Sequence, residues 1–232
     1  MRYTGVTARG IISPIFRQGD NLIEETCQAL LRASAAEGFS VQDGDIVAVT
    51  ESVVARTQGN SATLDQIAAD MATKLGGGSM GIVFPILSRN RFSLILKAAA
   101  QSCKKLYVQL SYPADEVGNA LVSWDMVDEK GINPHTDHFD EQGFRAMFGP
   151  TIHPFTGVDY IEYYKGLGDN VEILFSCDPT HILAYTDSVL CCDVHTRHRT
   201  ARRLQKAGAR CVVTLDNILT ESVLGSGFNP DY

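Results

Sequence analysis

The signals that direct a protein out of the cell or into a membrane are missing from this sequence. Residues 1–7 carry one basic side chain but lack the apolar core of a signal peptide, and no later apolar run is long enough to span a membrane. The six cysteines include no Cys-x-x-Cys pair, so neither a disulfide framework nor a zinc site is indicated, and we expect buried free thiols. We therefore predict a cytoplasmic protein with no membrane partner.

Signals for several kinds of chemistry are also missing. No cysteine has a recognisable catalytic context, so the sequence gives no support to a cysteine nucleophile. The glycine run at 76–78 follows a predicted helix and enters a predicted strand, whereas a phosphate loop follows a strand and opens a helix, so a flexible helix end is favoured. His135 and His138 lack the helical spacing of zinc hydrolases and indicate a loop, with contact to substrate as one alternative.

The composition that is present is that of an ordinary globular protein. Hydrophobic residues make up 44% of the 232 residues and charged residues 20%, and this length allows one large domain or two modest ones. The formal net charge of −7 repels polyanions, which argues against nucleic acid as a partner.

Helical and strand-like patterns alternate along the chain. Amphipathic spacing predicts one helix that begins near residue 22 and four more at about 63–75, 90–103, 179–185 and 197–207. Apolar runs predict strands at 46–49, 82–84, 106–110, 171–175, 189–192 and 211–213. Residues 122–170 have no long period and are interpreted as an insertion or cap. We predict an α/β (mixed α+β) fold of α-to-β units with mixed sheets and an inserted cap-like segment, divided into regions 1–121, 122–170 and 171–232.

Polar residues follow four of the predicted strands. They are Glu51-Ser52, Asp115-Glu116, Asp193-Val194-His195 and Asp216-Asn217. Ligands of open α/β sheets gather beyond the carboxyl ends of the strands, and converging carboxylates there suit Mg²⁺ or Mn²⁺. The alternative for each aspartate is that it caps the next helix or closes a turn.

The loop 193–197 carries the densest chemistry. Asp193 is favoured as a metal ligand because a basic helix follows it and the carboxylate is not needed for solubility. Arg197 lies near the start of that helix, where its planar guanidinium and the free N–H groups suit a phosphate; most of the other basic residues fit a solvated face. His195 is a candidate proton carrier or metal ligand, and a structural loop histidine is the alternative.

The N-terminal half of the chain resembles the coenzyme F420-0:L-glutamate ligases, also called F420 gamma-glutamyl ligases. The resemblance is carried by the order of several motifs over about the first 110 residues. These are Gly10-Ile11-Ile12-Ser13-Pro14-Ile15, Gly19-Asp20-Asn21-Leu22, Asp43-Gly44-Asp45-Ile46-Val47-Ala48-Val49-Thr50, Val53-Val54-Ala55-Arg56-Thr57-Gln58-Gly59 and Phe84-Pro85-Ile86-Leu87-Ser88-Arg89.

The resemblance implies a dimeric enzyme that uses GTP, or ATP, and a divalent metal to join glutamate by an amide bond to a carboxylate-bearing cofactor such as the deazaflavin coenzyme F420-0. Its two metal-binding aspartates correspond to Asp115 and Asp193, and we add Asp216 as a third carboxylate. We assign nucleotide and phosphate contacts to Ser13, Arg89 and Arg197, substrate contacts to Ser52 and Asn119, and proton transfer to His195.

Two segments depart from the family pattern. A His-Gly-Phe-x-Cys-Ala-Asn stretch before the first aspartate is missing, and the family's Gln-Lys after the second strand is Glu51-Ser52 here, which removes a cation. The acceptor could accordingly be a deazaflavin, a folate or an unrelated carboxylate. The alternative functions are a metal-dependent phosphohydrolase and a non-catalytic nucleotide- or cofactor-binding protein.

Overall fold

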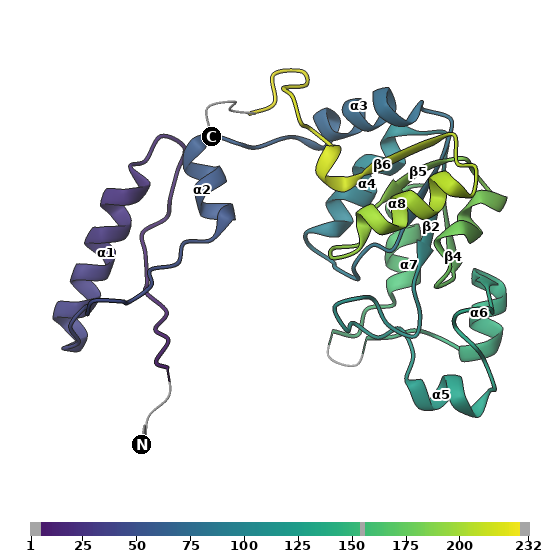
Figure 1. Ribbon diagram of the computed structural model, residues 1–232, viewed down its shortest axis with the longest axis horizontal. Coiled ribbons are helices and arrows are strands. Elements are labelled where there is room, and N and C mark those ends of the chain that lie inside the picture. The colour runs from purple at the N-terminus through teal and green to yellow at the C-terminus, as the bar shows by residue number, and fades with distance from the viewer. Residues whose placement is uncertain (1–5, 154–155, 228–232) are drawn as a thin grey trace. The chain divides into compact units, whose positions relative to one another are not determined.

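The computed structural model describes residues 6–153 and 156–227, which form two compact units (Figure 1). One unit contains the chain up to Ala62 and the residues from Gly225 onward, and the other contains Thr63–Leu224. The region boundaries predicted after residues 121 and 170 both fall inside the second unit, so they do not coincide with this division.

The first unit is built from two helices joined by irregular chain. Helix α1 (Leu22–Glu37) begins where Asn21 Oδ1 accepts a hydrogen bond from the Glu24 N–H at 3.1 Å, and its start agrees with the helix predicted from near residue 22. Helix α2 (Glu51–Gln58) follows Thr50. The strand predicted at 46–49 is wrong, because these residues form no strand. A strand needs a hydrogen-bonded neighbour, and no described residue of this unit pairs with them.

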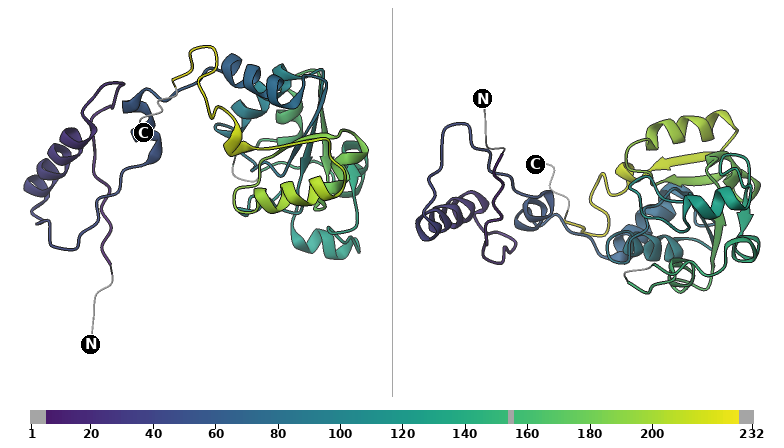
Figure 2. Two further views of the ribbon diagram at one scale, coloured as in Figure 1. Left: turned by 45° about the horizontal axis from the view of Figure 1, so that its top comes forward. Right: turned by 90° about the horizontal axis from the view of Figure 1, so that it is seen from below.

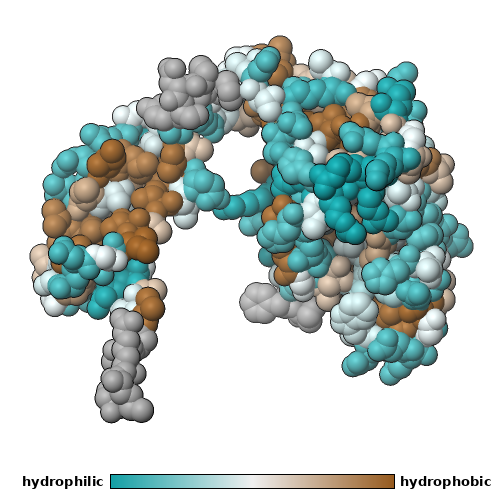
Figure 3. All heavy atoms as spheres, in the orientation of Figure 1, coloured by the Kyte–Doolittle hydropathy of each residue, from teal (hydrophilic) through white to brown (hydrophobic). Residues whose placement is uncertain are grey.

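The first unit also exposes many apolar side chains. Only four of its described residues are buried, namely Phe16, Ala29, Thr57 and Ser226. By contrast, Ile12 and Ile46 are 95% and 91% exposed, and Figure 3 shows brown apolar atoms spread over this unit. Apolar surface of this kind is characteristic of an interaction site.

The second unit is organised around a six-stranded sheet. The strands are β1 (Ser79–Val83), β2 (Lys105–Leu110), β3 (Phe139–Asp140), β4 (Val171–Phe175), β5 (Ser188–Cys191) and β6 (Cys211–Thr214). Their order in the sheet is β3-β4-β2-β1-β5-β6, with every pair parallel except β3 and β4. This mixed sheet and its helices confirm the predicted α/β class.

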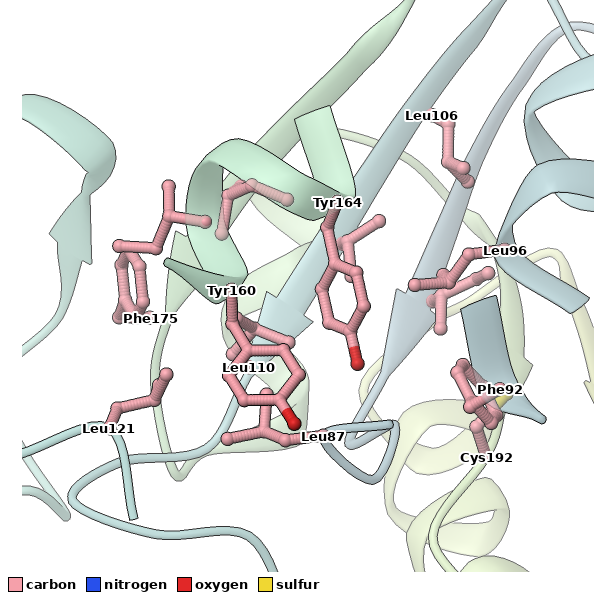
Figure 4. Close-up of a cluster of buried hydrophobic side chains, with 14 of the residues drawn as sticks. Leu87, Phe92, Leu96, Leu106, Leu110, Leu121, Tyr160, Tyr164, Phe175 and Cys192 are labelled. Atoms are coloured by element: carbon pink, nitrogen blue, oxygen red, sulfur yellow. The ribbon is translucent and has the colours of Figure 1, made fainter. Parts of the chain in front are cut away.

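Helices cover both faces of this sheet, as Figure 2 shows for α3 and α8. The elements are α3 (Leu64–Leu75), α4 (Phe92–Ser102), α5 (Trp124–Glu129), α6 (Glu141–Phe148), α7 (Tyr160–Lys165), α8 (Arg197–Lys206) and the 3₁₀ turns η1 (Pro179–Ala184) and η2 (Leu215–Asn217). The larger core joins α3, α4, α6 and α7 to one face (Figure 4), and a smaller cluster lies under η1 and α8. Buried strands of this kind appear in sequence as continuous apolar runs, which is why they were predictable.

The segment predicted as an insertion or cap contributes to the sheet and its core. Strand β3 pairs antiparallel with β4 at the edge of the sheet. Phe144, from α6, stacks on Phe175, from β4, with ring centroids 3.7 Å apart, and both side chains are fully buried. Residues 122–170 are therefore integrated into the fold.

Residues 76–81 match the spacing of two glycine motifs, Gly-x-Gly-x-x-Gly and Gly-x-Ser-x-Gly, without their structural context. Gly76 ends α3 with φ 92°, and the chain then enters β1 at its amino end. The Ser79 hydroxyl is engaged with Thr186 Oγ1 at 3.2 Å. The run is a helix end, as its place in the sequence predicted, and it lies at the edge of the sheet opposite to the strand carboxyl ends.

Candidate active site

The carboxyl ends of β1, β2 and β5 bring three loops to one edge of the sheet. Strand β1 pairs with β2 on one side and with β5 on the other, so residues that follow these strands are neighbours. Glu116, after β2, connects two of the loops: its carboxylate accepts hydrogen bonds from the backbone N–H groups of Val194 and His195, the latter at 3.1 Å. Both segments were predicted to follow strands, and the adjacency of β2, β1 and β5 brings them together.

Asp193 is buried beneath the start of α8 and only half of its carboxylate is satisfied. The residue is 2% exposed, and its Oδ2 accepts hydrogen bonds from the hydroxyls of Thr196 at 2.7 Å and Thr200 at 2.9 Å. Its Oδ1 is buried and has no hydrogen-bond partner among the described residues. A buried, unpaired acceptor costs about 1–3 kcal/mol, and more when it is charged. A cation or a donor that reached Oδ1 would remove that cost.

Asp115 is buried as well, but both of its oxygens are occupied. Oδ1 accepts from the N–H groups of Val117 at 3.1 Å and Asn119 at 2.8 Å. Oδ2 accepts from the Leu87 N–H at 2.8 Å and from the Asn119 side-chain amide at 2.7 Å. In this arrangement Asp115 joins the loop after β1 to the loop after β2, and Asn119 is one of its partners.

Glu116 experiences an environment that disfavours its charge. Burial raises the pKa of Glu116, and the negative charge of Asp193 raises it further. Hydrogen bonding from the His195 N–H and the positive charge of Arg197 act in the opposite direction. Local sequence patterns place Glu116 after a strand but indicate no role for it. Its contact with residues 194 and 195 depends on the order of the strands in the sheet.

Arg197 is held between Asp193 and Asp216. Its Nε–H donates to the Asp193 carbonyl at 2.9 Å, and its Nη1 lies 3.4 Å from Asp216 Oδ1. Asp216 also lies 3.4 Å from Nε2 of His198. Slight burial acts to raise the pKa of Asp216, but hydrogen bonds from Thr214 and Arg197 outweigh it and lower the pKa. The guanidinium is thus oriented before any ligand arrives.

The remaining predicted site residues lie in two places. The His195 side chain is exposed beside the Asp193 loop, and Arg89 is exposed in the loop after β1, where its carbonyl accepts a hydrogen bond from the Tyr163 hydroxyl at 2.7 Å. Ser13 and Ser52 belong to the first unit, where both are exposed. Their predicted contacts with nucleotide and substrate stay predictions.

The donors at this edge fit a magnesium-type ion that also binds phosphate. Across residues 6–153 and 156–227, no three His, Cys, Asp or Glu side chains are arranged to hold a metal ion by themselves. Mg²⁺, however, typically takes one or two protein carboxylates and completes its shell with phosphate oxygens and water. The unpaired Oδ1 of Asp193 is such a donor.

The cysteines and helices agree in part with the sequence predictions. All six cysteines are free; Cys191 and Cys192 are buried as expected, whereas Cys27 is exposed because it lies on the solvent side of α1. Burial raises the pKa of Cys191 to about 12, so this thiol stays protonated at neutral pH.

No described helix has the length and apolar character needed to cross a bilayer.

Comparisons with known proteins identify the family. No curated protein and no solved structure matches the chain. The model of the family described as F420-0:Gamma-glutamyl ligase matches residues 10–176, a span that includes Asp115 and ends immediately after β4. Because this match covers more than half of the 232 residues, the chain belongs to the F420-0:gamma-glutamyl ligase family and is a ligase by family membership.

Proposed function

We propose that this protein is a nucleoside triphosphate-dependent, divalent-metal-dependent ligase that joins an amino acid such as L-glutamate to a carboxylate-bearing cofactor such as coenzyme F420-0. The observation that carries the proposal is the unpaired, buried Oδ1 of Asp193 at the start of α8, next to Arg197. Family membership supports the class of reaction.

The metal would be held first by Asp193, which has a free oxygen, while Glu116, Asp115 and Asp216 would join only by giving up part of their present hydrogen bonds. Bound there, Mg²⁺ or Mn²⁺ would neutralise phosphate charge. This preference for Asp193 follows from hydrogen-bond occupancy: Asp115 accepts four hydrogen bonds, whereas Asp193 retains a free oxygen.

The protein groups would position the reactants and move one proton. Arg197 and the N–H groups at the start of α8 would bind the transferred phosphoryl group. The acceptor carboxylate would attack the γ-phosphorus, the bond to the nucleoside diphosphate would break, and an acyl phosphate would form. The amino acid's amine would then attack the acyl carbon, phosphate would leave, and the exposed imidazole of His195 would accept the proton lost by the amine.

The first test is a coupled assay of phosphate release and product mass. The protein would be incubated with GTP or ATP, Mn²⁺, a panel of amino acids and a panel of carboxylate acceptors that includes coenzyme F420-0. We expect phosphate release only when both an acceptor and an amino acid are present, with the acceptor gaining the mass of the amino acid minus water. The absence of turnover with every combination would contradict the proposal.

Two variants separate the ligase from the alternative functions. Asp193→Asn should abolish turnover, while Asp187→Asn, which alters an exposed ion pair with Arg210, is the matched control and should not change it. Phosphate release that does not depend on the amino acid would indicate a phosphohydrolase. Nucleotide binding without turnover, unchanged in Asp193→Asn, would indicate a non-catalytic binding protein.

The proposed assembly is a homodimer. Its support is the apolar surface of the first unit, where Ile12, Ile15, Ile23 and Ile46 are each more than three-quarters exposed. Burial of such side chains contributes roughly 25 cal/mol per Å² of apolar surface removed from water. Light scattering coupled to size exclusion should give twice the chain mass, and Ile12→Asp combined with Ile46→Asp should shift it toward the single chain. A wild-type mass equal to one chain would contradict the dimer.

A further inference from the structure

A stack of aromatic rings begins near the carboxyl end of β4 and runs over the face of the sheet beside η1, where the Tyr185 ring lies 5.2 Å from that of Tyr107 in β2. The imidazoles of His138 and His181 are stacked, with ring centroids 4.3 Å apart and an angle of 26° between their planes. The Tyr185 ring meets His181 edge-on at 5.7 Å. The three rings line a pocket of about 300 Å³ together with Phe139, Asp140 and Gly143. Neither the family match nor the proposed chemistry at Asp193 assigns a role to these rings.

The rings are held in place by buried backbone and hydroxyl groups. The Ser176 hydroxyl, which is fully buried, lies 2.9 Å from His138 Nδ1 and accepts a hydrogen bond from the Asp178 N–H at 3.0 Å. His181 is fixed in η1, where its backbone N–H donates a hydrogen bond to the Asp178 carbonyl at 3.1 Å. A platform ordered before binding loses little entropy when a ligand arrives, which favours recognition of a rigid ligand.

The charge state of His181 favours a neutral planar ligand. Burial lowers the pKa of His181, and the neighbouring His138 lowers it further, while Asp178 acts in the opposite direction. Near neutral pH His181 is therefore uncharged. His138 is an exposed residue, and among the described rings only His181 stacks on it. Stacking on such a surface suits any planar heteroaromatic ring, because every base has a π-face.

The His138–His181 pair lies a few strand spacings from the start of α8, where Arg197 lies. Strands β4 and β5 are separated by β2 and β1, so their ends are three spacings, or about 14 Å, apart. Helix α8 and η1 cover the same face and are joined by an ion pair of Arg203 with Asp178 at 3.0 Å. Phosphates at the start of α8 and a base at the end of β4 would therefore place the nucleotide along one edge of the sheet.

We propose that the His138–His181 stack is the base-binding subsite for the nucleotide, an inference that rests on the proposed function and extends it. Asp140, whose Oδ1 accepts from the Gly143 N–H at 2.7 Å, presents its carboxylate to the same pocket. A carboxylate accepts hydrogen bonds only, and guanine offers adjacent ring N–H and amino donors where adenine offers an amino group alone. The subsite accordingly selects guanine over adenine.

The experiment compares a ligand that has a base with one that has only phosphates. Calorimetric titrations with GTP and with inorganic triphosphate, each with Mg²⁺, would be made on the wild type and on His181→Ala, His138→Ala and His181→Phe. We expect the two alanine variants to bind GTP about tenfold more weakly, the order expected for loss of one stacking ring, and triphosphate with unchanged affinity. His181→Phe retains a planar ring and should bind GTP as the wild type does.

The matched control is His135→Ala, which removes an exposed histidine from the same loop but outside the pocket, and thermal melting checks that each variant is folded. Asp140→Asn should reduce the preference for GTP over ATP. Equal GTP affinity in the wild type and both alanine variants would overturn the base-binding subsite while leaving the proposed function intact. An equal loss of GTP and triphosphate affinity would also overturn it. Failure of the wild type to bind GTP, and ATP in the same titration, would overturn both proposals.

Discussion

The two buried aspartates at the sheet edge should differ strongly in how much stability the same Asp→Asn substitution removes. In Asp115→Asn, one carboxylate oxygen becomes an amide nitrogen, and the two N–H donors that faced that oxygen then meet another donor. Hydrogen bonds to a charged group contribute about 1.5–3 kcal/mol each, so the loss is about 3–6 kcal/mol. In Asp193→Asn, the remaining oxygen still accepts hydrogen bonds from the hydroxyls of Thr196 and Thr200. The amide nitrogen replaces an oxygen that had no hydrogen-bond partner. We expect a change within about 1 kcal/mol.

The assay is urea unfolding followed by circular dichroism, supported by calorimetry. For a unit of this size each kcal/mol lowers the melting temperature by about 2–4 °C, so Asp115→Asn should melt on the order of 10 °C lower and Asp193→Asn within a few degrees of the wild type. Thr200→Val, which removes one hydroxyl from Asp193, should cost about 1.5–3 kcal/mol and serves as a control for the geometry. Equal destabilisation by the two Asp→Asn substitutions would refute the assignment of a free oxygen to Asp193.

Three further predictions concern packing and charge. Phe144→Ala should lower the free energy of unfolding by about 3–5 kcal/mol in urea titrations, because its fully buried ring joins residues 122–170 to the sheet; a change below 1 kcal/mol would show that this segment is dispensable. Arg145 and Asp159 are paired at 2.9 Å: burial acts to raise the pKa of Asp159, but Arg145 and backbone N–H donors outweigh it and lower the pKa. The stability from this pair is thus present above the ordinary aspartate pKa and is lost as pH falls through the lowered value; Arg145→Met should flatten that acid limb in pH-dependent unfolding, and an unchanged limb would contradict the pairing. The pH dependence of stability that Glu116 contributes runs in the opposite direction to that of Asp159, because the pKa of Glu116 is raised in the folded state. Wild-type stability should fall as pH rises from the ordinary glutamate pKa through the raised value, and Glu116→Gln should lack that slope; an identical slope in both proteins would assign it to another group.

Sequence patterns located β1, β2, β4, β5 and β6 and the loops that follow them, but not the short edge strand β3. The run at 171–175 is apolar at four of its five positions and coincides with β4, and the polar residues after β2 and β5 were correctly read as strand ends on one sheet edge. Both inferences depend on local properties, since a buried parallel strand is apolar throughout and its end is marked by the first polar residues.

Features that depend on pairing across the chain were beyond local patterns. The apolar residues 46–49 have the composition of a strand, yet no neighbour pairs with them among the described residues. The contact of Glu116 with residues 194 and 195 follows from the adjacency of β2, β1 and β5, which no local pattern encodes. The same holds for His138 and Ser176, which are 38 residues apart and meet only because β3 returns beside β4.

The sheet order has a consequence for how the protein is made. Strands β1, β2 and β4 are neighbours and come earlier in the chain, so they are available for pairing before β5 has left the ribosome. Asp193, Arg197 and α8 arrive only with β5, whose pairing with β1 closes a connection of more than a hundred residues. The edge proposed to bind phosphate is therefore completed only after β1, β2 and β4, and a chain synthesised up to β4 would lack Asp193 and Arg197, the residues proposed to hold the metal and the phosphate.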